Sequence, residues 1–260
     1  MIELRNHVHR ISDVSLGVAP DPAYRTPAAM PIRPVQAPMR PWRESLSLIE
    51  RHMSFKRRSL HAGDPVQTAG DAFGCLHLVH FGAIKTIVLA ACGCQQIVGL
   101  HLKGDWVGFD GIATGYSACN GCAMDISEIW TVCYATLLKT AERAPELMHL
   151  LHTAMGSQLA RQHKWRIAMA TLPADARLAD FLRSWVQALA LRDLRTDNIR
   201  LRLTRAEIGN YLGMTLETVS RSFSRLAKFG LIAFDDKGHR RFAIPDIDAL
   251  VAFVEIRTHS

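Results

Sequence analysis

The chain has 260 residues, of which 48% are hydrophobic and 21% charged, and its formal net charge of +7 at pH 7 gives a sequence pI of about 9.3. This composition is typical of a globular chain with a sizeable core, in one large domain or two ordinary ones. It contains neither an apolar run of the roughly 18 residues that span a bilayer nor an apolar signal segment at its start, so we expect a cytoplasmic protein without membrane association. The positive charge is compatible with a polyanionic partner such as nucleic acid.

The first 143 residues are predicted to contain a tail and a β-rich body. Residues 1–41 hold seven of the eleven prolines and lack a helical or strand period, which predicts a disordered or loosely docked tail. The spacing of Leu46, Ile49 and Met53 then indicates one short helix. Short apolar runs separated by glycines follow, and they predict a compact β-roll in a sensor-type domain over residues 42–143.

A single long helix is predicted over residues 146–172, within a dimerisation segment of residues 144–172. Pro145 suits a first helical turn, and Gly156 is the only glycine within the run. One line of residues at alternating spacings of four and three predicts a seam against a partner helix, and a simple core helix is the alternative. The seam residues are Met148, His152, Met155, Leu159, Gln162 and Arg166. Because Gln162 is neutral where an acidic residue would repel its symmetry mate, we expect a homodimer that is stable without a cofactor.

Residues 173–260 are predicted to form a winged helix-turn-helix domain. The pattern indicates three helices followed by a two-stranded hairpin with a turn at residues 235–238. The helices are 174–191, 204–212 and 216–229, and the strands are 231–234 and 241–244. The whole chain is therefore expected to be α+β, with a β-roll, a long helix and a winged helix-turn-helix.

The two short helices carry the chemistry of this domain. Thr204 and Glu207 form a T-x-x-E capping box, and Gly213 stands where the turn between the helices needs a positive φ. Thr215 is expected to cap the second helix.

The outward face of the second helix combines short acceptors with a planar cation. Its residues Glu217, Ser220 and Arg221 suit base edges in a major groove. We expect Thr215 to lie at the same DNA interface, and Arg205 and Arg225 to contact phosphates. The alternative is an ordinary amphipathic helix pair in which Glu217 and Arg221 form a solvated ion pair.

The sequence T-R-A-E-I-G-N-Y-L-G-M-T-L-E-T-V-S-R, residues 204–221, closely resembles the helix-turn-helix of Crp/Fnr transcription regulators. Its E-x-x-S-R resembles the Fnr branch, whereas the Crp branch has R-E-x-x-G-R and Leu216 stands in the place of that first Arg. Residues 99–112 also resemble the Fnr β-roll, and the likeness covers roughly residues 42–255. It implies a dimeric activator that binds palindromic double-stranded DNA with TTGAT-like half-sites and contacts RNA polymerase through β-roll loops.

The resemblance fails at the family's cofactor positions. The likeness to Fnr would imply an oxygen sensor whose [4Fe-4S] cluster uses three N-terminal cysteines and a fourth on a β-roll strand, but here no cysteine precedes Cys75 and Trp130 matches the fourth position. The Gly-Glu and Arg-Ser/Thr of the cyclic-nucleotide cassette are replaced by Gly-Phe-Asp at 108–110 and Ser-Ala-Cys at 117–119. No Arg is left to pair a phosphate, so we expect neither cofactor.

Four of the six cysteines occur in two close pairs, Cys92-x-Cys94 at a predicted hairpin tip and Cys119-x-x-Cys122 in a loop. Both loops are expected at one end of the β-roll. Three interpretations remain: small residues without a role, a redox pair, or a four-thiolate zinc or iron-sulfur site. The rival function is thus a thiol-based redox or metal-binding switch. No catalytic triad, P-loop or paired-carboxylate pattern occurs, and we expect no enzyme activity.

Overall fold

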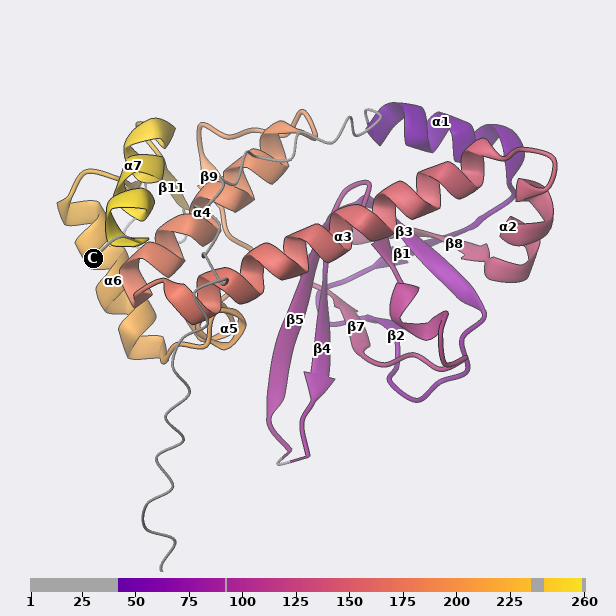
Figure 1. Cartoon of the computed structure of the whole chain (residues 1–260), viewed down its shortest axis with the longest axis horizontal. Coiled ribbons are helices and arrows are strands. Elements are labelled where there is room, and N and C mark those ends of the chain that lie inside the picture. Colours follow the sequence, from indigo (N-terminus) through magenta and orange to yellow (C-terminus); the bar gives the residue numbers. More distant parts are fainter. Residues whose placement is uncertain (1–41, 92, 235–240, 259–260) are drawn as a thin grey trace, which may run out of the picture. The chain divides into compact units, whose positions relative to one another are not determined.

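The computed structural model describes residues 42–91, 93–234 and 241–258. The predicted N-terminal tail, Cys92 and the turn of the predicted C-terminal hairpin lie outside these residues. The described residues contain a β-roll, a long helix and a helical C-terminal region, in this order along the chain (Figure 1). The predicted α+β architecture is therefore confirmed. Among these residues, no helix combines the length and the apolar character that crossing a membrane requires.

Two four-stranded antiparallel sheets form the β-roll, in the orders β1-β8-β3-β6 and β2-β7-β4-β5. The strands are β1 (Lys56–Leu60), β2 (Pro65–Gln67), β3 (Cys75–Phe81), β4 (Ala83–Leu89), β5 (Gln95–Leu102), β6 (Trp106–Val107), β7 (Asn120–Ala123) and β8 (Ser127–Cys133). A short 3-10 helix covers Phe109–Gly111. Apolar side chains from both sheets pack between them: Leu60, Val66, Val79, Ile84, Val107, Ala123 and Ile129.

Three helices supply a second apolar cluster with β3, β6 and β8. They are α1 (Trp42–His52), α2 (Tyr134–Ala141) and the first half of α3 (Glu146–Thr171). The prediction of α1 is confirmed, and its Leu46 and Ile49 are buried together with Met53, which follows the helix. Helix α2 is not indicated by the sequence pattern, because it begins directly where β8 ends.

The predicted long helix is confirmed as α3, and its two halves differ in burial. Leu147, Leu150 and Leu151 in its first half are buried, whereas Leu159 and Ile167 farther along are about half exposed. In Figure 1, α3 runs from α1 and α2 to the C-terminal helices. It therefore connects the β-roll to the region that the sequence assigns to DNA.

The C-terminal region contains the predicted helix-turn-helix and a small sheet of order β10-β11-β9. Its elements are α4 (Ala174–Ala190), β9 (Ile199–Arg200), α5 (Arg205–Leu212), α6 (Leu216–Lys228), β10 (Ala233–Phe234), β11 (Arg241–Ala243) and α7 (Ile247–Thr258). The two predicted hairpin strands pair, with Ala233 opposite Ala243, but both are shorter than expected. Strand β9 and helix α7 are not predicted by the sequence.

Candidate nucleic-acid interface

The predicted capping box at the start of α5 is confirmed. The Thr204 hydroxyl accepts a hydrogen bond from the Glu207 amide at 3.2 Å, and Glu207 Oε2 accepts one from the Thr204 amide at 2.8 Å. These two hydrogen bonds provide acceptors for two backbone N–H groups that would otherwise lack partners at the start of the helix. This cap fixes where the first helix of the pair begins.

The turn between α5 and α6 depends on Gly213. Its φ of 60° is left-handed, and a Cβ added there would lie 2.5 Å from Cε of Met169 in α3. Arg177 of α4 donates to the Leu212 carbonyl at 2.9 Å and to the Leu172 carbonyl at 3.0 Å. The positive φ thus favours glycine here, whereas the nearby Cε of Met169 is the end of a flexible side chain that can shift.

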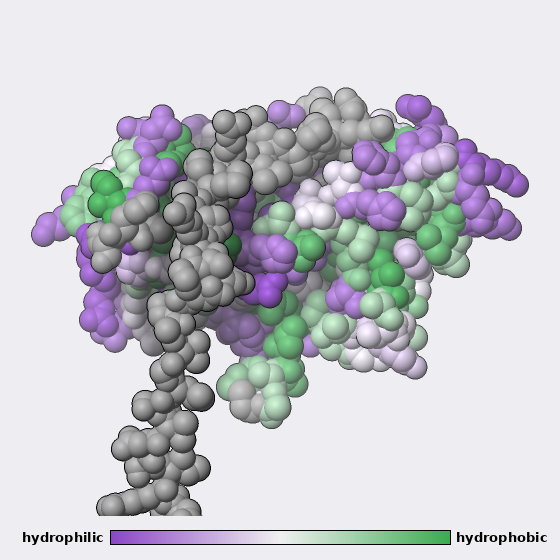
Figure 2. Space-filling view, in the orientation of Figure 1, coloured by the Kyte–Doolittle hydropathy of each residue, from purple (hydrophilic) through white to green (hydrophobic). Residues whose placement is uncertain are grey.

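Helix α6 buries one face and exposes the other. Thr215 caps it by accepting from the Thr218 amide at 3.2 Å, as predicted. The buried face carries Val219, Phe223 and Leu226. The exposed face consists of Leu216, Glu217, Ser220, Arg221 and Ser224. Figure 2 shows hydrophilic residues along the edge of the molecule where Figure 1 places α6.

The polar groups of this exposed face remain available to a ligand. Glu217 and Arg221 form an i, i+4 ion pair at 3.2 Å, but their side chains are 76% and 64% exposed. The Ser220 hydroxyl donates to the Leu216 carbonyl at 2.9 Å. Because its proton is used within the helix, its remaining lone pairs face outward as acceptors. The face therefore offers carboxylate, hydroxyl and guanidinium groups on neighbouring turns.

The two arginines predicted to contact phosphates have different surroundings. Arg225 is half exposed and contacts Asp175 at 3.2 Å. Arg205 is half-buried, with its guanidinium carbon 3.2 Å from the centroid of the Phe223 ring, and this burial lowers the pKa of Arg205 to about 10. Arg205 thus packs within the helix-turn-helix, a role that its sequence position does not reveal.

Polar side chains of α5 attach the helix-turn-helix to the β-roll. Glu207 Oε1 forms an ion pair with Lys85 of β4. The Asn210 side chain accepts from the Ile97 amide and donates to the Gln95 carbonyl, both at 2.6 Å, so it pairs with the backbone of β5. Sequence reasoning misses these contacts because the partners lie more than 100 residues apart.

A buried carboxylate makes a second attachment. Asp105, in the turn before β6, contacts Arg192 after α4 at 2.9 Å and Arg161 of α3 at 3.2 Å. Burial raises the pKa of the Asp105 carboxyl, but Arg161 and Arg192 outweigh this effect and hold the pKa below its usual range. One carboxylate thus joins the β-roll, the long helix and the C-terminal region.

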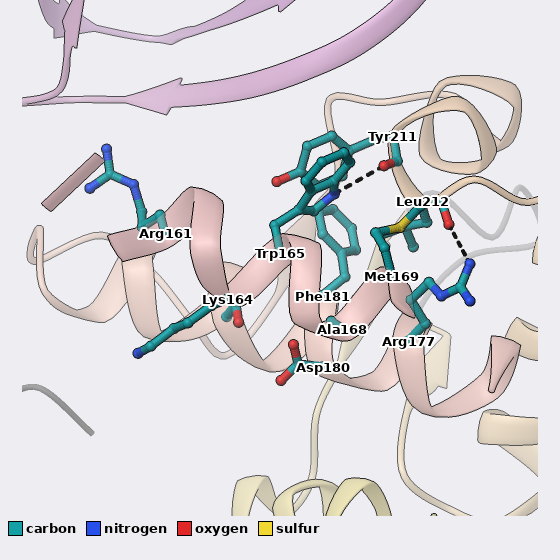
Figure 3. Close-up of a pocket in the computed structure, with 11 residues that line it drawn as sticks. Arg161, Lys164, Trp165, Ala168, Met169, Arg177, Asp180, Phe181, Tyr211 and Leu212 are labelled. Carbon is teal, nitrogen blue, oxygen red and sulfur yellow. Dashed lines mark hydrogen bonds between the residues drawn. The ribbon is translucent and has the colours of Figure 1, made fainter. Parts of the chain in front are cut away.

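A cavity of about 130 Å³ lies where α3, α4 and α5 meet (Figure 3). Figure 3 shows the rings of Trp165, Phe181 and Tyr211 side by side, and Trp165 Nε1 donates to the Tyr211 carbonyl at 3.1 Å. Burial raises the pKa of Tyr211 to about 12. These contacts fix the end of α5 against α3.

The predicted dimer seam on α3 is largely open in the single chain. His152, Met155, Leu159, Gln162 and Arg166 are exposed, while Met148 is half-buried. The seam residues project from one helix, and three of them, Met148, Met155 and Leu159, are apolar. Its use in dimerisation stays a prediction.

Of the four paired cysteines the structure describes Cys94, Cys119 and Cys122, and these three do not form a common site. Cys119 directly precedes β7 and is buried, whereas Cys122 within β7 is half-buried and lies, by strand alternation, on the face opposite to the buried Gly121. On β4, Cys122 is paired with Lys85, and Gln95, the neighbour of Cys94, is paired with Leu89. Lys85 and Leu89 are four residues apart, so Cys122 and Gln95 are separated by about 13 Å along the strand, at 3.3 Å per residue. Within the described ranges, no group of three or more His, Cys, Asp or Glu side chains could hold a metal ion.

The family's two cofactor positions contain other side chains. Trp130 is 1% exposed and stacks between Phe55 and His80, with ring centroids 4.1 and 4.3 Å away. Asp110 Oδ2 accepts from the amides of Ala118 and Cys119 at 2.8 and 3.2 Å. A buried indole thus stands at the position that the resemblance assigns to the fourth cluster ligand, and Asp110 accepts from two amides of the segment that it assigns to the phosphate cassette. The expectation that neither cofactor binds stays a prediction.

Two comparisons with known proteins agree with the resemblance seen in the sequence, one with a family model and one with individual proteins. Residues 176–253 match the Crp-like helix-turn-helix domain. The transcriptional regulatory protein btr of Bordetella pertussis is 31% identical over 196 residues, which are 75% of this chain and 81% of that protein. The fumarate and nitrate reduction regulatory protein of Salmonella typhimurium is 31% identical over 197 residues, which are 76% of this chain and 78% of that protein.

A solved structure shares the fold. The structure of FixK2 from Bradyrhizobium japonicum covers 77% of this chain and 97% of its own, with a TM-score of 0.68 and 24% identity. The relatives are transcription regulators, not enzymes, and they do not favour the alternative of a thiol-based switch. The chain has the family's helix-turn-helix and is similar to these regulators over three quarters of its length. It therefore belongs to the Crp/Fnr family of DNA-binding transcription regulators.

Proposed function

We propose that the chain is an activator of the Fnr branch that binds palindromic DNA with TTGAT-like half-sites as a homodimer. One α6 enters the major groove of each half-site, where Glu217, Ser220 and Arg221 contact base edges. Thr215 and Arg225 contact the flanking phosphates. Loops of the β-roll contact RNA polymerase.

The observation that carries the proposal is the two-sided character of α6. Its apolar face is anchored by Val219, Phe223 and Leu226, while Glu217 and Arg221 remain mostly exposed. An exposed i, i+4 ion pair contributes little to stability, so Glu217 and Arg221 can break it and contact DNA at low cost in free energy. The polar residues thus serve the fold little and suit a ligand well.

The dimer is supported by the seam on α3. Leu159 is 50% exposed and Met155 is 38% exposed. Burying such side chains against a second α3 removes apolar area from water, at about 25 cal/mol per Å². We expect a dimer in sedimentation at micromolar concentration without any added cofactor, and a monomer there contradicts the proposal. Leu159→Glu is expected to shift the chain toward the monomer, whereas Leu191→Glu, at an exposed position outside the seam, is the matched control.

Regulation is proposed to use neither the [4Fe-4S] cluster nor a cyclic nucleotide. Trp130 fills the position that matches the fourth cluster ligand, and the Asp110 carboxylate would repel a phosphate at the amides it already binds. Purified protein is therefore expected to bind DNA without either group.

The test uses the full chain and two fluorescent duplexes of equal length and composition. One carries two inverted TTGAT-like half-sites one helical turn apart, and the other carries the same bases scrambled. At equal salt, we expect the palindrome to bind at least about 10³-fold more tightly. Equal affinity for the two duplexes contradicts the proposed sequence reading. Transcription with purified RNA polymerase from a promoter that carries the palindrome then tests activation.

A further inference from the structure

Cys75 and Cys133 lie directly opposite each other on neighbouring strands of the β-roll. Cys75 is the first residue of β3, Cys133 is the last residue of β8, and the antiparallel register pairs them. Both are free thiols. Neither belongs to the two close pairs that stand out in the sequence.

The hydrogen bonding beside this pair fixes its geometry. The Tyr134 amide donates to the Gly74 carbonyl at 2.9 Å, one residue outward on each strand. Cys75 and Cys133 therefore form a non-hydrogen-bonded pair, in which Cα atoms are about 4.5 Å apart and side chains approach closely. This separation lies within the range of about 4.4 to 6.8 Å that disulfides span. Both residues lie at an end of their strand, where the backbone can adjust most easily.

The two thiols differ in exposure and in their neighbours. Cys133 is exposed and occupies the N-cap position of α2. The amide and hydroxyl of Thr136, together with the Ala135 amide, stabilise its thiolate and lower the pKa of Cys133. Cys75 is half-buried, and burial together with the nearby Cys133 raises the pKa of Cys75. Cys133 is thus suited to attack an oxidant, and Cys75 to resolve the product.

We propose that Cys75 and Cys133 form a reversible disulfide when the protein meets a hydroperoxide. The Cys133 thiolate attacks the terminal oxygen of the hydroperoxide, so that an S–O bond forms, the O–O bond breaks and the alkoxide leaves as an alcohol after taking a proton. Sγ of Cys75 then attacks Sγ of Cys133, the S–S bond forms and the hydroxide leaves with the thiol proton as water. Two thiols are oxidised and one hydroperoxide is reduced. A dithiol restores both cysteines by exchange.

The other described cysteines lack this combination. Burial and Asp110 raise the pKa of Cys119 to about 12, and burial also raises the pKa of Cys122. Cys94 is exposed, but it lies at the β4–β5 turn, away from β3 and β8. Oxidation is therefore expected to select the pair of Cys75 and Cys133. The new bond would tie β3 to the start of α2, which packs against α3.

The experiment treats the reduced full chain with hydrogen peroxide, alkylates the remaining thiols and maps the peptides by mass spectrometry. We expect one cross-linked peptide that joins Cys75 to Cys133 within a single chain, with the loss of two hydrogen atoms and full reversal by dithiothreitol. Cys75→Ser should give a Cys133 sulfenic acid that dimedone traps, and Cys133→Ser should give no cross-link at Cys75. Cys122→Ser is the matched control, and it should form the same disulfide as the native chain.

Several outcomes overturn the proposal. These are a native chain without the Cys75–Cys133 peptide, a cross-link that joins two chains through Cys133, and peroxide oxidation of Cys75 that persists in Cys133→Ser. A second measurement avoids variants altogether. In the native chain at neutral pH, iodoacetamide should label Cys133 before Cys122, and the reverse order contradicts the proposed thiolate.

Discussion

Helices α5 and α6 are neighbours in the helix-turn-helix, and each begins at a threonine that caps it. On α6, Glu217 and Arg221 are mostly exposed to solvent and form an ion pair with each other. On α5, Glu207 contacts Lys85 and Asn210 pairs with the backbone of β5. The same local signature thus serves two purposes: α5 fastens the motif to the β-roll, and α6 presents its polar face to solvent.

Caps and amphipathic patterns therefore predict where a helix forms, but not what its polar face contacts. If the division is correct, substitutions on the exposed polar face of α6 should change DNA binding and leave the free energy of unfolding nearly unchanged. Substitutions of the α5 side chains that contact the β-roll should do the opposite.

Arg221→Ala should cause the largest loss, because it removes a bidentate contact to guanine from each half-site. We expect a cost of about 1 to 3 kcal/mol per half-site in binding to the cognate palindrome. Fluorescence anisotropy on cognate and random duplexes measures it, with Arg195→Ala as the control at an exposed arginine paired with Asp197. Equal weakening on random DNA would show that Arg221 contacts only phosphate.

Leu216→Arg should alter the sequence preference of α6 without abolishing binding. Leu216 is 55% exposed and begins the outward face of the helix. A long cation there resembles the Crp-type reader, so we expect preference to move from TTGAT-like toward TGTGA-like half-sites, by about 1 to 3 kcal/mol for each base pair that the new arginine reads. Competition between the two palindromes measures the change. An unchanged preference would place Leu216 outside the groove.

Asn210→Ala should affect the fold instead of DNA reading. The substitution removes the acceptor of the Ile97 amide, and Ile97 is only 4% exposed. It also removes the donor to the Gln95 carbonyl. Leaving such groups without a partner costs about 1 to 3 kcal/mol, which urea unfolding can measure. Gln187→Ala on the exposed side of α4 is the control and should change stability by less than about 0.5 kcal/mol. Normal stability of Asn210→Ala would refute the attachment.

Much of the fold follows from local sequence signals. The capping box of Thr204 and Glu207, the positive φ of Gly213 and the long uninterrupted run of α3 are each set by residues close together in the chain, and each is confirmed. The outward face of α6 is also predictable, because helical periodicity fixes which side chains oppose the buried Val219 and Phe223.

The remaining features depend on strand pairing and on contacts between distant residues. Lys85 meets Glu207 across 122 positions, and no local pattern marks either residue as a partner of the other. Of the interpretations left open for the paired cysteines, a site shared by Cys119 and Cys122 is not supported, because Cys119 is buried and Cys122 lies on the face of β7 opposite to the buried Gly121. Cys75 and Cys133 are brought together by register, which sequence alone leaves undetermined.

The two capping threonines provide the finest test of the comparison between α5 and α6. Thr204→Ala and Thr215→Ala each remove one N-cap acceptor, so each should lower the free energy of unfolding by about 1 kcal/mol in urea titrations. Thr215 lies at the exposed start of α6, so its variant should also weaken binding to the palindrome, whereas Thr204→Ala should not, because Lys85 still holds Glu207 and with it the start of α5. Serine at either position keeps the acceptor oxygen and should restore stability. If Thr204→Ala weakens DNA binding as much as Thr215→Ala does, the start of α5 takes part in DNA binding as well, and the two helices do not divide their roles.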